Sequence, residues 1–398
     1  IDDAPDNGIF LGLLPGVPEG GWYALEVRAT DDPTNWSTGQ NRWGVGILMA
    51  CIGQSNMKEW FFTGTDLTAH PLLRRYTDSG WHTLDGRGNG AIACGNRLIA
   101  RTGVPVGLIE YAVNGSGLHR KADWGTGYWE DTRPGSIYRR FLSGVAATGG
   151  RLEFVLWIQG EADAARGTVT GADYQAALTR FVARQVRRDI INGSTQPQLP
   201  FLVVAMVKRP GGRDVPHQAI RDAQQAVTEQ VAECYLAATT LDLTNLGKQH
   251  LTPEAYITMG HRVAQTVLYV LGMADFYRGP VVAAVRQNDE RTLDVTLQHH
   301  GGTDILPETG ITGWEVMDAA GAAPIQNVFR HDPRTIRIRL ERALQARAEV
   351  RYLYGAEPDA RRALRDNASP GLPLEAFRGG VAPPSASPHR TPPETITP

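Results

Sequence analysis

Five short apolar runs alternate with helical segments in the middle of the chain, and this alternation limits the possible folds more than any other feature. A strand buried on both faces reads as a continuous apolar run, and parallel strands need a helix-length connection between them. The pattern therefore predicts an α/β fold with a parallel five-stranded sheet and helices on both faces. The predicted strands are 45–51, 104–111, 154–158, 201–207 and 235–241, and the predicted helices are 91–101, 137–147, 172–190, 218–232 and 253–271.

The segments on either side of this region have other patterns, which divide the chain into four parts. Tyr23, Leu25 and Val27 alternate with polar residues and predict a half-buried strand. Because the chain begins at Ile1 without a leader pattern, we expect it to be processed or a fragment of a longer protein. Alternation at 293–297 and 336–340 predicts a β-sandwich. The predicted parts are an N-terminal β segment at 1–42, interpreted as the remnant of a preceding domain, a main domain at 43–273, a β-sandwich domain at 279–381, and a disordered Pro-rich tail at 382–398.

Charge and composition exclude several classes of protein. The 40 Lys and Arg residues against 42 Asp and Glu residues give a net charge of −2, and no basic run marks a nucleic-acid surface. No apolar stretch approaches the roughly 20 residues that a membrane span requires, so we expect no membrane insertion. Cys51, Cys94 and Cys234 are too few and too widely spaced for a disulfide framework or a zinc site.

The first predicted strand is followed by Gly53, Gln54, Ser55, Asn56 and Met57. A serine between a strand and a helix has backbone N–H groups that point at a ligand and a hydroxyl that faces the cleft. Ser55 is therefore a candidate nucleophile. Its position alone equally fits a helix N-cap, which is the more common use of a serine there.

The second and third strands are also followed by polar groups. Gly115 follows the second strand, and its N–H is a candidate oxyanion donor, although Asn114 and Gly115 also form a common turn pair. Gln159 ends the third strand, and its side chain could donate to an oxyanion or be a satisfied loop amide. Glu161 and Asp163 could orient loops or a histidine, or cap the next segment.

A histidine follows the fifth predicted strand. This strand leads to Asp242 and then to His250, which enters the last helix through Leu-Thr-Pro. A histidine at this place can reach the serine hydroxyl as a general base. Of the ten histidines, His250 is the one in the expected position, and the others near strand ends or in helices are better interpreted as surface or packing residues.

In combination, these motifs resemble the sialate O-acetylesterase group of SGNH hydrolases, which is related to carbohydrate esterase family six. The paired motifs Gly-Gln-Ser-Asn-Met at 53–57 and Trp-Ile-Gln-Gly-Glu-Ala-Asp at 157–163 carry most of the resemblance. Arg-Asp-Ala-Gln at 221–224 and the histidine before Leu-Thr-Pro follow in the same order. Gly-Trp-Glu-Val at 313–316 and Val-Arg-Tyr-Leu-Tyr-Gly at 350–355 are similar to the terminal β-domain of that family.

The resemblance implies a flavodoxin-like three-layer catalytic domain that removes O-acetyl groups from sugars through an acetyl-enzyme. Ser55 would be the nucleophile and His250 the general base and acid. The oxyanion hole would comprise the Ser55 N–H, the Gly115 N–H and the Gln159 side chain. Supporting roles would fall to Gln54, Asn114 and Glu161. No metal or organic cofactor is implied, and the expected partner is an acetylated carbohydrate, which places the protein in a secreted, periplasmic or cell-surface location. The motifs carry no information on oligomeric state.

The chain departs from the family pattern at one position. SGNH enzymes commonly have an Asp three residues before the histidine, and here that residue is Gly247. One alternative is a Ser/His dyad with a backbone carbonyl that holds the imidazole, and this is the favoured interpretation. The other is an acid from elsewhere in the chain, with Asp242 ahead of Glu161.

Three functions stay open at this point. They are a carbohydrate O-acetylesterase, an SGNH esterase or lipase for another acyl ester, and an inactive glycan-binding protein. Aromatic residues on loops between the strands could stack on a sugar ring or could be packing residues. These residues are Trp81, Trp124, Tyr128 and Trp129.

Overall fold

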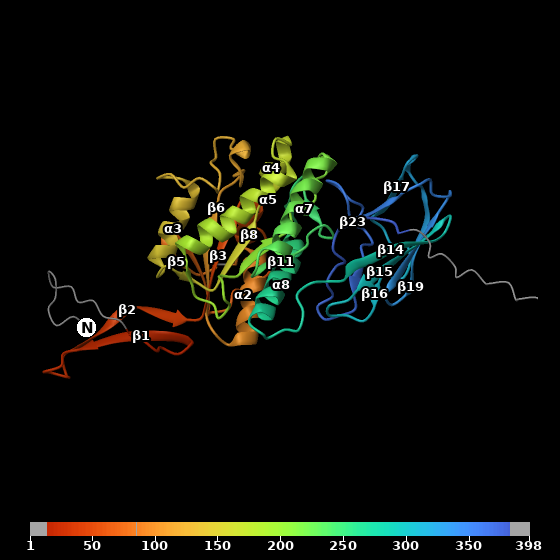
Figure 1. Cartoon of the computed structure of the whole chain (residues 1–398). Coiled ribbons are helices and arrows are strands. Elements are labelled where there is room, and N and C mark those ends of the chain that lie inside the picture. Colours follow the sequence, from red (N-terminus) through yellow and green to blue (C-terminus); the bar gives the residue numbers. More distant parts are fainter. Residues whose placement is uncertain (1–13, 85, 383–398) are drawn as a thin grey trace, which may run out of the picture.

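The computed structural model describes residues 14–84 and 86–382, and it is built around a seven-stranded sheet (Figure 1). The strand order is β11-β10-β8-β3-β6-β4-β5, and every neighbouring pair is parallel except β4 and β5. The strands are β3 Ile47–Gly53, β4 Leu73–Thr77, β5 Gly80–His82, β6 Val106–Ala112, β8 Phe154–Ile158, β10 Phe201–Val204 and β11 Cys234–Ala238.

All five predicted strands are present in this sheet, but the prediction that the sheet has five strands is wrong. β4 and β5 extend it at the β6 edge. The sequence of β4 contains Arg74 and Arg75 at its centre and therefore lacks the apolar run that marks the other parallel strands. Of β4 only Leu73 is fully buried, and a strand that is partly exposed need not be continuously apolar.

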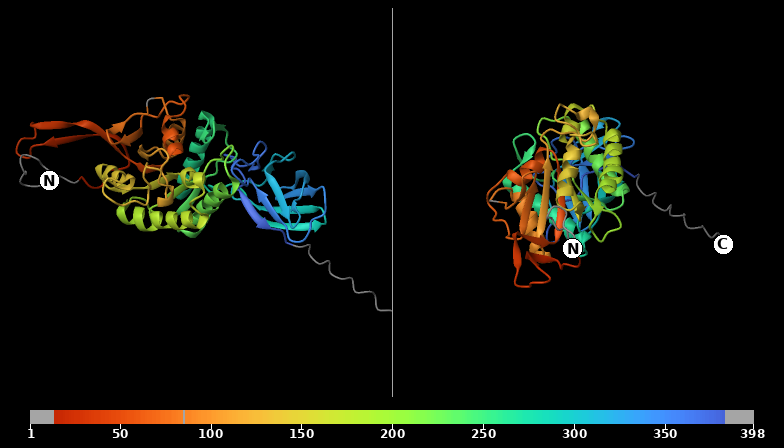
Figure 2. Two further views of the ribbon diagram at one scale, coloured as in Figure 1. Left: turned by 90° about the horizontal axis from the view of Figure 1, so that it is seen from above. Right: turned by 90° about the vertical axis from the view of Figure 1, so that its left-hand side faces the viewer.

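Helices cover both faces of the sheet (Figures 1 and 2). Alternate side chains of β3 show this directly, because Met49 and Cys51 belong to one buried cluster and Ala50 and Ile52 to the other. The first cluster is covered by α1 Ser55–Phe62, α2 Asn89–Thr102 and α8 Pro253–Val270. The second is covered by α3 Ile137–Ala147, α5 Gly171–Arg180 with its continuation η2 Phe181–Val186 and α6 Arg187–Asp189, and α7 Asp214–Gln230.

The five predicted helices are confirmed to within a few residues at their ends. The start of α8 is set by local chemistry, since the Thr252 hydroxyl accepts a hydrogen bond of 3.3 Å from the Ala255 N–H and Pro253 occupies the first turn. Within the described residues no helix is long and apolar enough to cross a membrane. The short elements of this region are η1 Arg120–Ala122, α4 Glu161–Arg166, β7 Arg151–Leu152, β9 Ile191–Asn192, β12 Asn245–Leu246 and β13 His250–Leu251.

After the last helix the chain forms antiparallel sheets around a third buried cluster. The sheets have the orders β14-β15-β20-β19 and β18-β17-β21-β23, and the alternating residues at 293–297 and 336–340 point into the cluster as predicted. The strands are β14 Val281–Asp289, β15 Thr292–Gln298, β17 Trp314–Asp318, β18 Gly321–Ala322, β19 Ile325–Asp332, β20 Thr335–Leu340, β21 Glu349–Tyr352 and β23 Phe377–Gly380, and β16 Ile305–Leu306 pairs with β22 Arg365–Asp366.

This C-terminal β region is fixed to the α/β region by both apolar and polar contacts. Leu241, which follows β11, belongs to the buried cluster of the β region. At the start of α7 the Asp214 carboxylate accepts a hydrogen bond of 2.8 Å from the Ala356 N–H, and the Gln218 side chain accepts one of 3.1 Å from the Gly355 N–H. The chain that leads from β11 to His250 therefore begins in the packed junction between the two regions.

The N-terminal strand is present, but it is half-buried only at its beginning, where Tyr23 lies, and not over its whole length as predicted. β1 Gly20–Arg28 pairs only with β2 Trp36–Val45, and the two form a ribbon that projects from the α/β region (Figures 1 and 2). Leu25 and Val27 are exposed, whereas nearer the α/β region the Arg74 guanidinium lies 4.5 Å from the Trp22 ring centroid. Of the predicted tail at 382–398, all but Ala382 lies outside the described residues, as do residues 1–13.

Candidate active site

Ser55 lies at the carboxyl edge of the sheet, where β3 and β8 come into very close contact. Gly53 has a φ of +150°, and a Cβ there would lie 2.0 Å from the Ile158 carbonyl oxygen, so only glycine fits. The Gln54 N–H donates to the same carbonyl at 3.1 Å, and the Gln54 Oε1 accepts from the Ala162 N–H at 3.1 Å. These contacts hold the first residue of α1, Ser55, beside the end of β8, and Ser55 is 8 % exposed.

The two backbone donors predicted for an oxyanion lie on adjoining segments. The Ser55 N–H is in the first turn of α1, where backbone N–H groups have no partner within the helix. Gly115 is the third residue of a turn that is closed by a 3.2 Å hydrogen bond from the Ser116 N–H to the Val113 carbonyl. Its φ of +71° favours glycine. The Val113 N–H donates to the Gly53 carbonyl at 3.1 Å, which fixes this turn against the end of β3, and Asn114 is exposed in the turn.

The Gln159 side chain, in contrast, is fully engaged inside the protein. Its Nε2 lies 2.6 Å from Asp163 Oδ2, 3.2 Å from Gln54 Oε1 and 3.2 Å from the Ser116 carbonyl. Its Oε1 accepts a hydrogen bond of 2.9 Å from the Tyr174 hydroxyl. Because an amide has only two N–H groups, these acceptors use both of them. In this structure the Gln159 side chain joins the segments around the site, and its oxyanion role stays a prediction.

Asp163 is the acid that organises the loop after the Gly115 turn. It is completely buried and accepts hydrogen bonds from the Leu118 N–H at 2.9 Å and the His119 N–H at 3.1 Å, besides that from Gln159. Burial raises the pKa of Asp163 to about 6, although the hydrogen bonds oppose this rise. Of the roles left open for this acid, the structure shows loop orientation.

Asn56 also connects several parts of the site, and its importance was missed in the sequence. Its Nδ2 donates to Glu161 Oε1 at 2.7 Å and to the Gln249 carbonyl at 2.9 Å, and its Oδ1 accepts from the Tyr256 hydroxyl at 2.8 Å. One side chain thus joins α1, the end of β8, the loop that carries His250, and α8. The partners are far away in the sequence, so its place in the Gly-Gln-Ser-Asn-Met motif was the only available signal.

His250 is presented by a small hairpin that packs against α1. In this hairpin β12 and β13 are antiparallel, and Leu246 lies opposite His250. Gly247 has a φ of +71° and makes the tight return, which gives a physical reason for a glycine where related enzymes carry Asp. His250 is half-buried, and its Nε2 is buried without a hydrogen-bond partner among the described residues. This nitrogen can accept a proton.

Neither candidate acid is hydrogen-bonded to the His250 ring. Asp242 forms a two-pronged ion pair with Arg262 of α8, at 2.8 and 2.6 Å, which anchors its loop, and its role as the orienting acid stays a prediction. Glu161 is 3 % exposed, and burial raises the pKa of its carboxyl. It reaches the His250 loop only through Asn56. Among the described residues no three His, Cys, Asp or Glu side chains are grouped so that they could hold a metal ion.

The four aromatic residues proposed for sugar stacking have different positions. Trp129 is buried against Trp157, with ring centroids 5.5 Å apart, and is a core residue. Trp81 packs on Tyr76 and lies over the sheet at Gly107, away from Ser55. Tyr128 is half-buried. Trp124 is 39 % exposed, on a loop whose Thr126 hydroxyl donates to the Gly115 carbonyl at 3.1 Å. Trp124 is therefore the aromatic residue that remains a candidate for sugar stacking.

The chain is similar to known carbohydrate esterases. The family model described as "carbohydrate esterase, sialic acid-specific acetylesterase" matches residues 58–269, a match that begins three residues after Ser55. A carbohydrate acetylesterase from Xanthomonas citri is similar in structure, with a TM-score of 0.72 and 21 % identity over 92 % of this chain and 87 % of that one. At this identity the likeness shows a shared fold.

Two shorter structures cover part of the chain. One is a protein from Arabidopsis thaliana, with a TM-score of 0.43 and 21 % identity over 56 % of this chain and 97 % of that one. The other is Est24, a carbohydrate acetylesterase from Sinorhizobium meliloti, with a TM-score of 0.38 and 17 % identity over 56 % of this chain and 100 % of that one. No curated protein sequence matches the chain significantly.

Proposed function

Because this chain belongs to the sialic acid-specific acetylesterase family of carbohydrate esterases, we propose that Ser55 and His250 perform its deacetylation reaction as a serine esterase dyad. The observation that carries this proposal is the buried Nε2 of His250, which has no hydrogen-bond partner among the described residues and lies on a hairpin packed against the helix of Ser55. Asn56 ties the two segments together. A serine needs such a base to become a nucleophile.

The same proposal specifies the fold in finer terms. Residues 43–273 would form an SGNH hydrolase domain with a flavodoxin-like three-layer arrangement, and residues 279–381 a β-sandwich domain. Supporting features are the helices on both faces of the mostly parallel sheet and the single buried cluster between the C-terminal antiparallel sheets. In this fold Ser55, the Gly115 turn and His250 all follow the carboxyl ends of strands. Open α/β sheets bind their ligands at this edge.

In the proposed reaction His250 takes the Ser55 proton as the hydroxyl oxygen attacks the acetyl carbonyl. The Ser55 and Gly115 N–H groups donate to the oxyanion that develops, and the start of α1 adds the favourable field of a helix N-terminus. His250 then gives its proton to the leaving sugar oxygen, which leaves Ser55 acetylated. Water attacks this ester with His250 again as base, and acetate and free Ser55 result.

The mechanism is tested by acetate release from acetylated xylan, acetylated sialosides and a bacterial acetylated exopolysaccharide. We expect Ser55→Ala and His250→Ala to lose measurable turnover on the substrate that the wild type uses. Ser143→Ala is the matched control, because Ser143 is exposed on α3 and its hydroxyl bonds only within its helix, to the Arg139 carbonyl. Acetate release by Ser55→Ala at the wild-type rate would exclude the proposed nucleophile.

A fluorophosphonate probe separates an active esterase from an inactive glycan-binding protein. The probe labels only an activated serine, so we expect one label per chain, on Ser55, and none in Ser55→Ala. Labelling that persists in Ser55→Ala, or that never occurs in the wild type, would contradict the proposal. An extracytoplasmic location is proposed on the substrate class alone, and cell fractionation tests it.

A further inference from the structure

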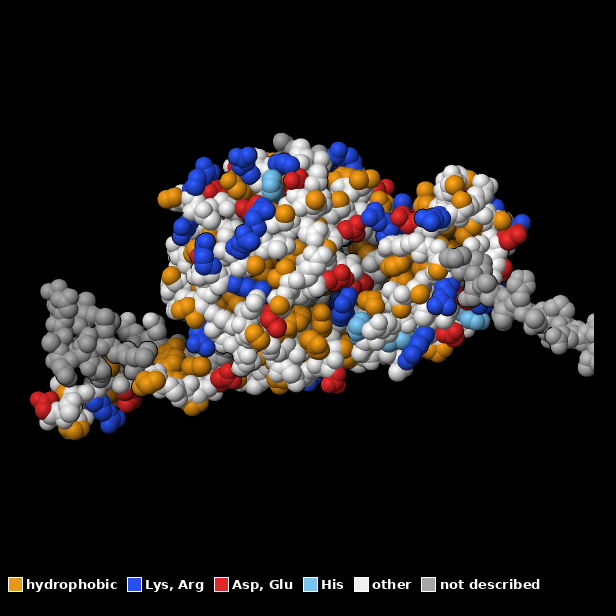
Figure 3. Space-filling model, viewed as in Figure 1, with side chains coloured by type: hydrophobic (Ala, Val, Ile, Leu, Met, Phe, Trp, Pro, Cys, Tyr) orange, Lys and Arg blue, Asp and Glu red, His pale blue; other side chains and the backbone are white. Residues whose placement is uncertain are grey.

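A small cavity of about 30 Å³, the junction cavity, lies between the α/β region and the C-terminal β region. Its walls come from α7, from β11 and the residues that follow β10 and β11, and from the segments after β21 and before β23. In the view of Figure 3 the two regions are in contact, and acidic and basic side chains lie along the line where they meet. The charged side chains that line the cavity are Arg221, Asp242 and Glu375.

Arg221 of α7 is a buried cation in the wall of this cavity. Its Nη2 donates to the Gly355 carbonyl and, at 3.3 Å, to Gln218 Oε1. Its Nε and Nη1 are buried without a hydrogen-bond partner among the residues that the structure describes. Burial lowers the pKa of Arg221 to about 10, so the guanidinium is still charged at neutral pH. A buried charge with unused donors is costly unless an opposite charge accompanies it.

The two acids in the wall are already paired with other arginines. Asp242 accepts hydrogen bonds of 2.8 and 2.6 Å from Arg262. Glu375 accepts hydrogen bonds of 2.8 and 2.6 Å from Arg278. Each of these pairs is neutral as a whole. Among the residues that line the cavity, all of which the structure describes, Arg221 is therefore the charge that has no opposite charge in contact with it.

Two further acids lie near Arg221 but outside the cavity wall. Asp222 and Asp214 partly oppose the fall in the pKa of Arg221 that burial causes. Asp222 accepts a hydrogen bond of 2.7 Å from the Gln218 side chain, and Asp214 accepts one of 2.8 Å from the Ala356 N–H. Both acids are open to solvent, which weakens their attraction, and neither is hydrogen-bonded to Arg221.

The Thr239 hydroxyl is a further unused donor in the same wall. It is buried and has no hydrogen-bond partner within the described part of the chain. Most of the remaining wall is apolar. One water-sized particle needs about 10–15 Å³ of such space, so the cavity holds one or two particles of that size and is too small for a sugar ring. A single small anion fits both the size of the cavity and its unused donors.

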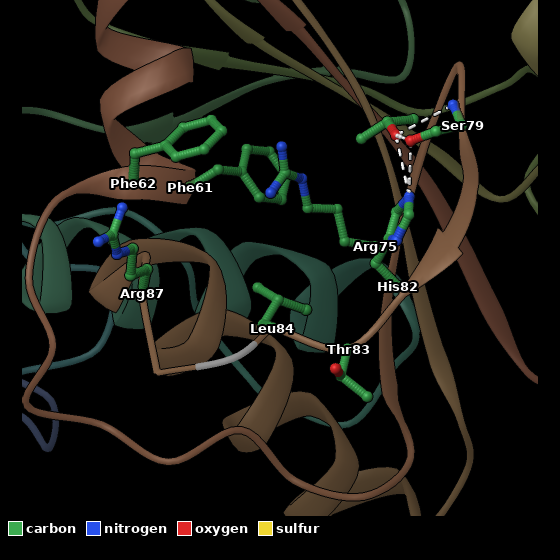
Figure 4. A pocket seen from close by; sticks show the side chains of 9 residues that line it. Phe61, Phe62, Arg75, Ser79, His82, Thr83, Leu84 and Arg87 are labelled. Carbon is green, nitrogen blue, oxygen red and sulfur yellow. Dashed lines mark hydrogen bonds between the residues drawn. The ribbon is translucent and has the colours of Figure 1, made fainter.

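The polar groups of a larger cavity, beside β4 and β5, are instead engaged with one another (Figure 4). This cavity has a volume of about 340 Å³. Its Ser79 hydroxyl lies 2.9 Å from His82 Nε2 and 2.9 Å from the Thr77 hydroxyl, and its Arg75 is ion-paired with Glu110. These contacts satisfy the groups without a ligand, whereas the unused donors of the junction cavity indicate one.

We propose that the junction cavity binds one small inorganic anion of the size of chloride, with the Arg221 guanidinium and the Thr239 hydroxyl as its donors. The anion supplies the opposite charge that Arg221 lacks within the wall. It also joins α7 to the segment after β11, which continues to His250, and to the β region that closes the cavity. The site is separate from the proposed deacetylation, which does not use it.

Exchange of chloride for gluconate at constant ionic strength tests the site, because general screening stays the same and gluconate is too large for the cavity. A ligand that binds only the folded protein raises the melting temperature once its concentration exceeds its Kd. We expect the melting temperature of the wild type to rise by roughly 2–4 °C as chloride replaces gluconate, and to level off at saturation. Equal melting temperatures in the two salts would overturn the site.

Three variants connect this response to the cavity. Arg221→Met removes the charge and keeps an apolar side chain, so its melting temperature should not depend on chloride. Thr239→Val removes a single donor and should weaken the chloride affinity about tenfold, and it carries the test if Arg221→Met does not fold. Arg187→Met is the matched control and should keep the full response, since Arg187 donates to the Leu199 and Glu233 carbonyls at 3.0 and 2.9 Å. An unchanged chloride response in either cavity variant would contradict the assignment.

Bromide, which scatters X-rays anomalously, locates the anion directly. Crystals grown with bromide in place of chloride should show one anomalous peak within hydrogen-bond reach of Arg221 and Thr239. The absence of a peak there overturns the site, and a peak combined with equal melting temperatures in the two salts marks an adventitious ion only. None of these measurements uses turnover, so the tests of Ser55 and His250 succeed or fail independently of them.

Discussion

The Asn56 side chain donates a hydrogen bond of 2.9 Å to the backbone carbonyl of Gln249, the residue directly before His250. Asn56 directly follows Ser55, so this single bond joins the segment of the proposed nucleophile to the segment of the proposed base. The same amide group also binds the buried Glu161 at 2.7 Å. The position of His250 relative to Ser55 is thus fixed by residues that lie more than a hundred positions apart in the chain.

Asn56→Ala tests this connection. We expect its kcat on an acetyl ester to fall roughly 10²-fold, because a displacement of about 1 Å between reacting groups has an effect of that size. Its free energy of unfolding should fall by about 1–3 kcal/mol, since Glu161 and the Gln249 carbonyl lose their donor. Steady-state kinetics and urea unfolding measure the two effects. Tyr256→Phe, which removes the bond to Asn56 Oδ1 but leaves both Nδ2 bonds, should have a smaller effect, and a wild-type kcat in Asn56→Ala would refute the connection.

Gln159→Ala distinguishes a buried connecting amide from an oxyanion donor. As a connector, Gln159 should affect mainly stability, and its loss should lower the free energy of unfolding by about 1–3 kcal/mol, because Asp163 and the Ser116 carbonyl lose a donor. Urea unfolding and kcat are measured on the same preparation. A 10²- to 10³-fold fall in kcat with unchanged stability would instead return Gln159 to the oxyanion hole.

Asp242→Asn distinguishes a loop anchor from an acid that orients the histidine. The variant weakens the ion pair with Arg262, whose side chain is largely buried, so the melting temperature should fall. The pH profile of kcat/KM should keep its wild-type shape, since Asp242 does not contact the His250 ring. If the melting temperature is unchanged while the acid limb of the profile shifts, Asp242 orients the histidine after all.

The buried Asp163 makes stability depend on pH. Its pKa is about 6 in the folded protein, above the ordinary Asp value of 3.8. Because the pKa is higher in the folded protein than in the unfolded chain, folding favours the protonated carboxyl. The protonated carboxyl therefore contributes stability that is fully present below about pH 4 and is lost as the pH rises through about 6. A shift of this size corresponds to about 3 kcal/mol.

We therefore expect the free energy of unfolding of the wild type to fall between pH 4 and pH 7 relative to that of Asp163→Asn. Urea unfolding at a series of pH values measures the difference. The difference in the free energy of unfolding should change by about 3 kcal/mol over this pH range. If the free energies of the two proteins instead depend on pH in the same way, Asp163 keeps an ordinary pKa in the folded protein.

Local sequence patterns were sufficient to predict those strands and helices whose burial is evident from their own residues. Continuous apolar runs identified all five buried parallel strands, and helical spacing identified the helices between them. The Thr252 and Pro253 pair correctly placed the start of α8. The patterns failed at β4, a partly buried strand with two arginines at its centre, and at β1, whose Leu25 and Val27 are exposed.

By itself the sequence determined which segments of the chain form the five buried parallel strands and the helices between them, because these features depend on neighbouring residues. It also placed Ser55, Gly115 and His250 just beyond strand ends, where the geometry of a parallel sheet brings side chains together. Only the tertiary structure decided the partners of the polar side chains. Asp242 binds Arg262, Gln159 binds Asp163, and Asn56 binds Gln249. A buried polar group must find a partner wherever the fold brings one within about 3 Å, and separation along the chain carries no information about that distance.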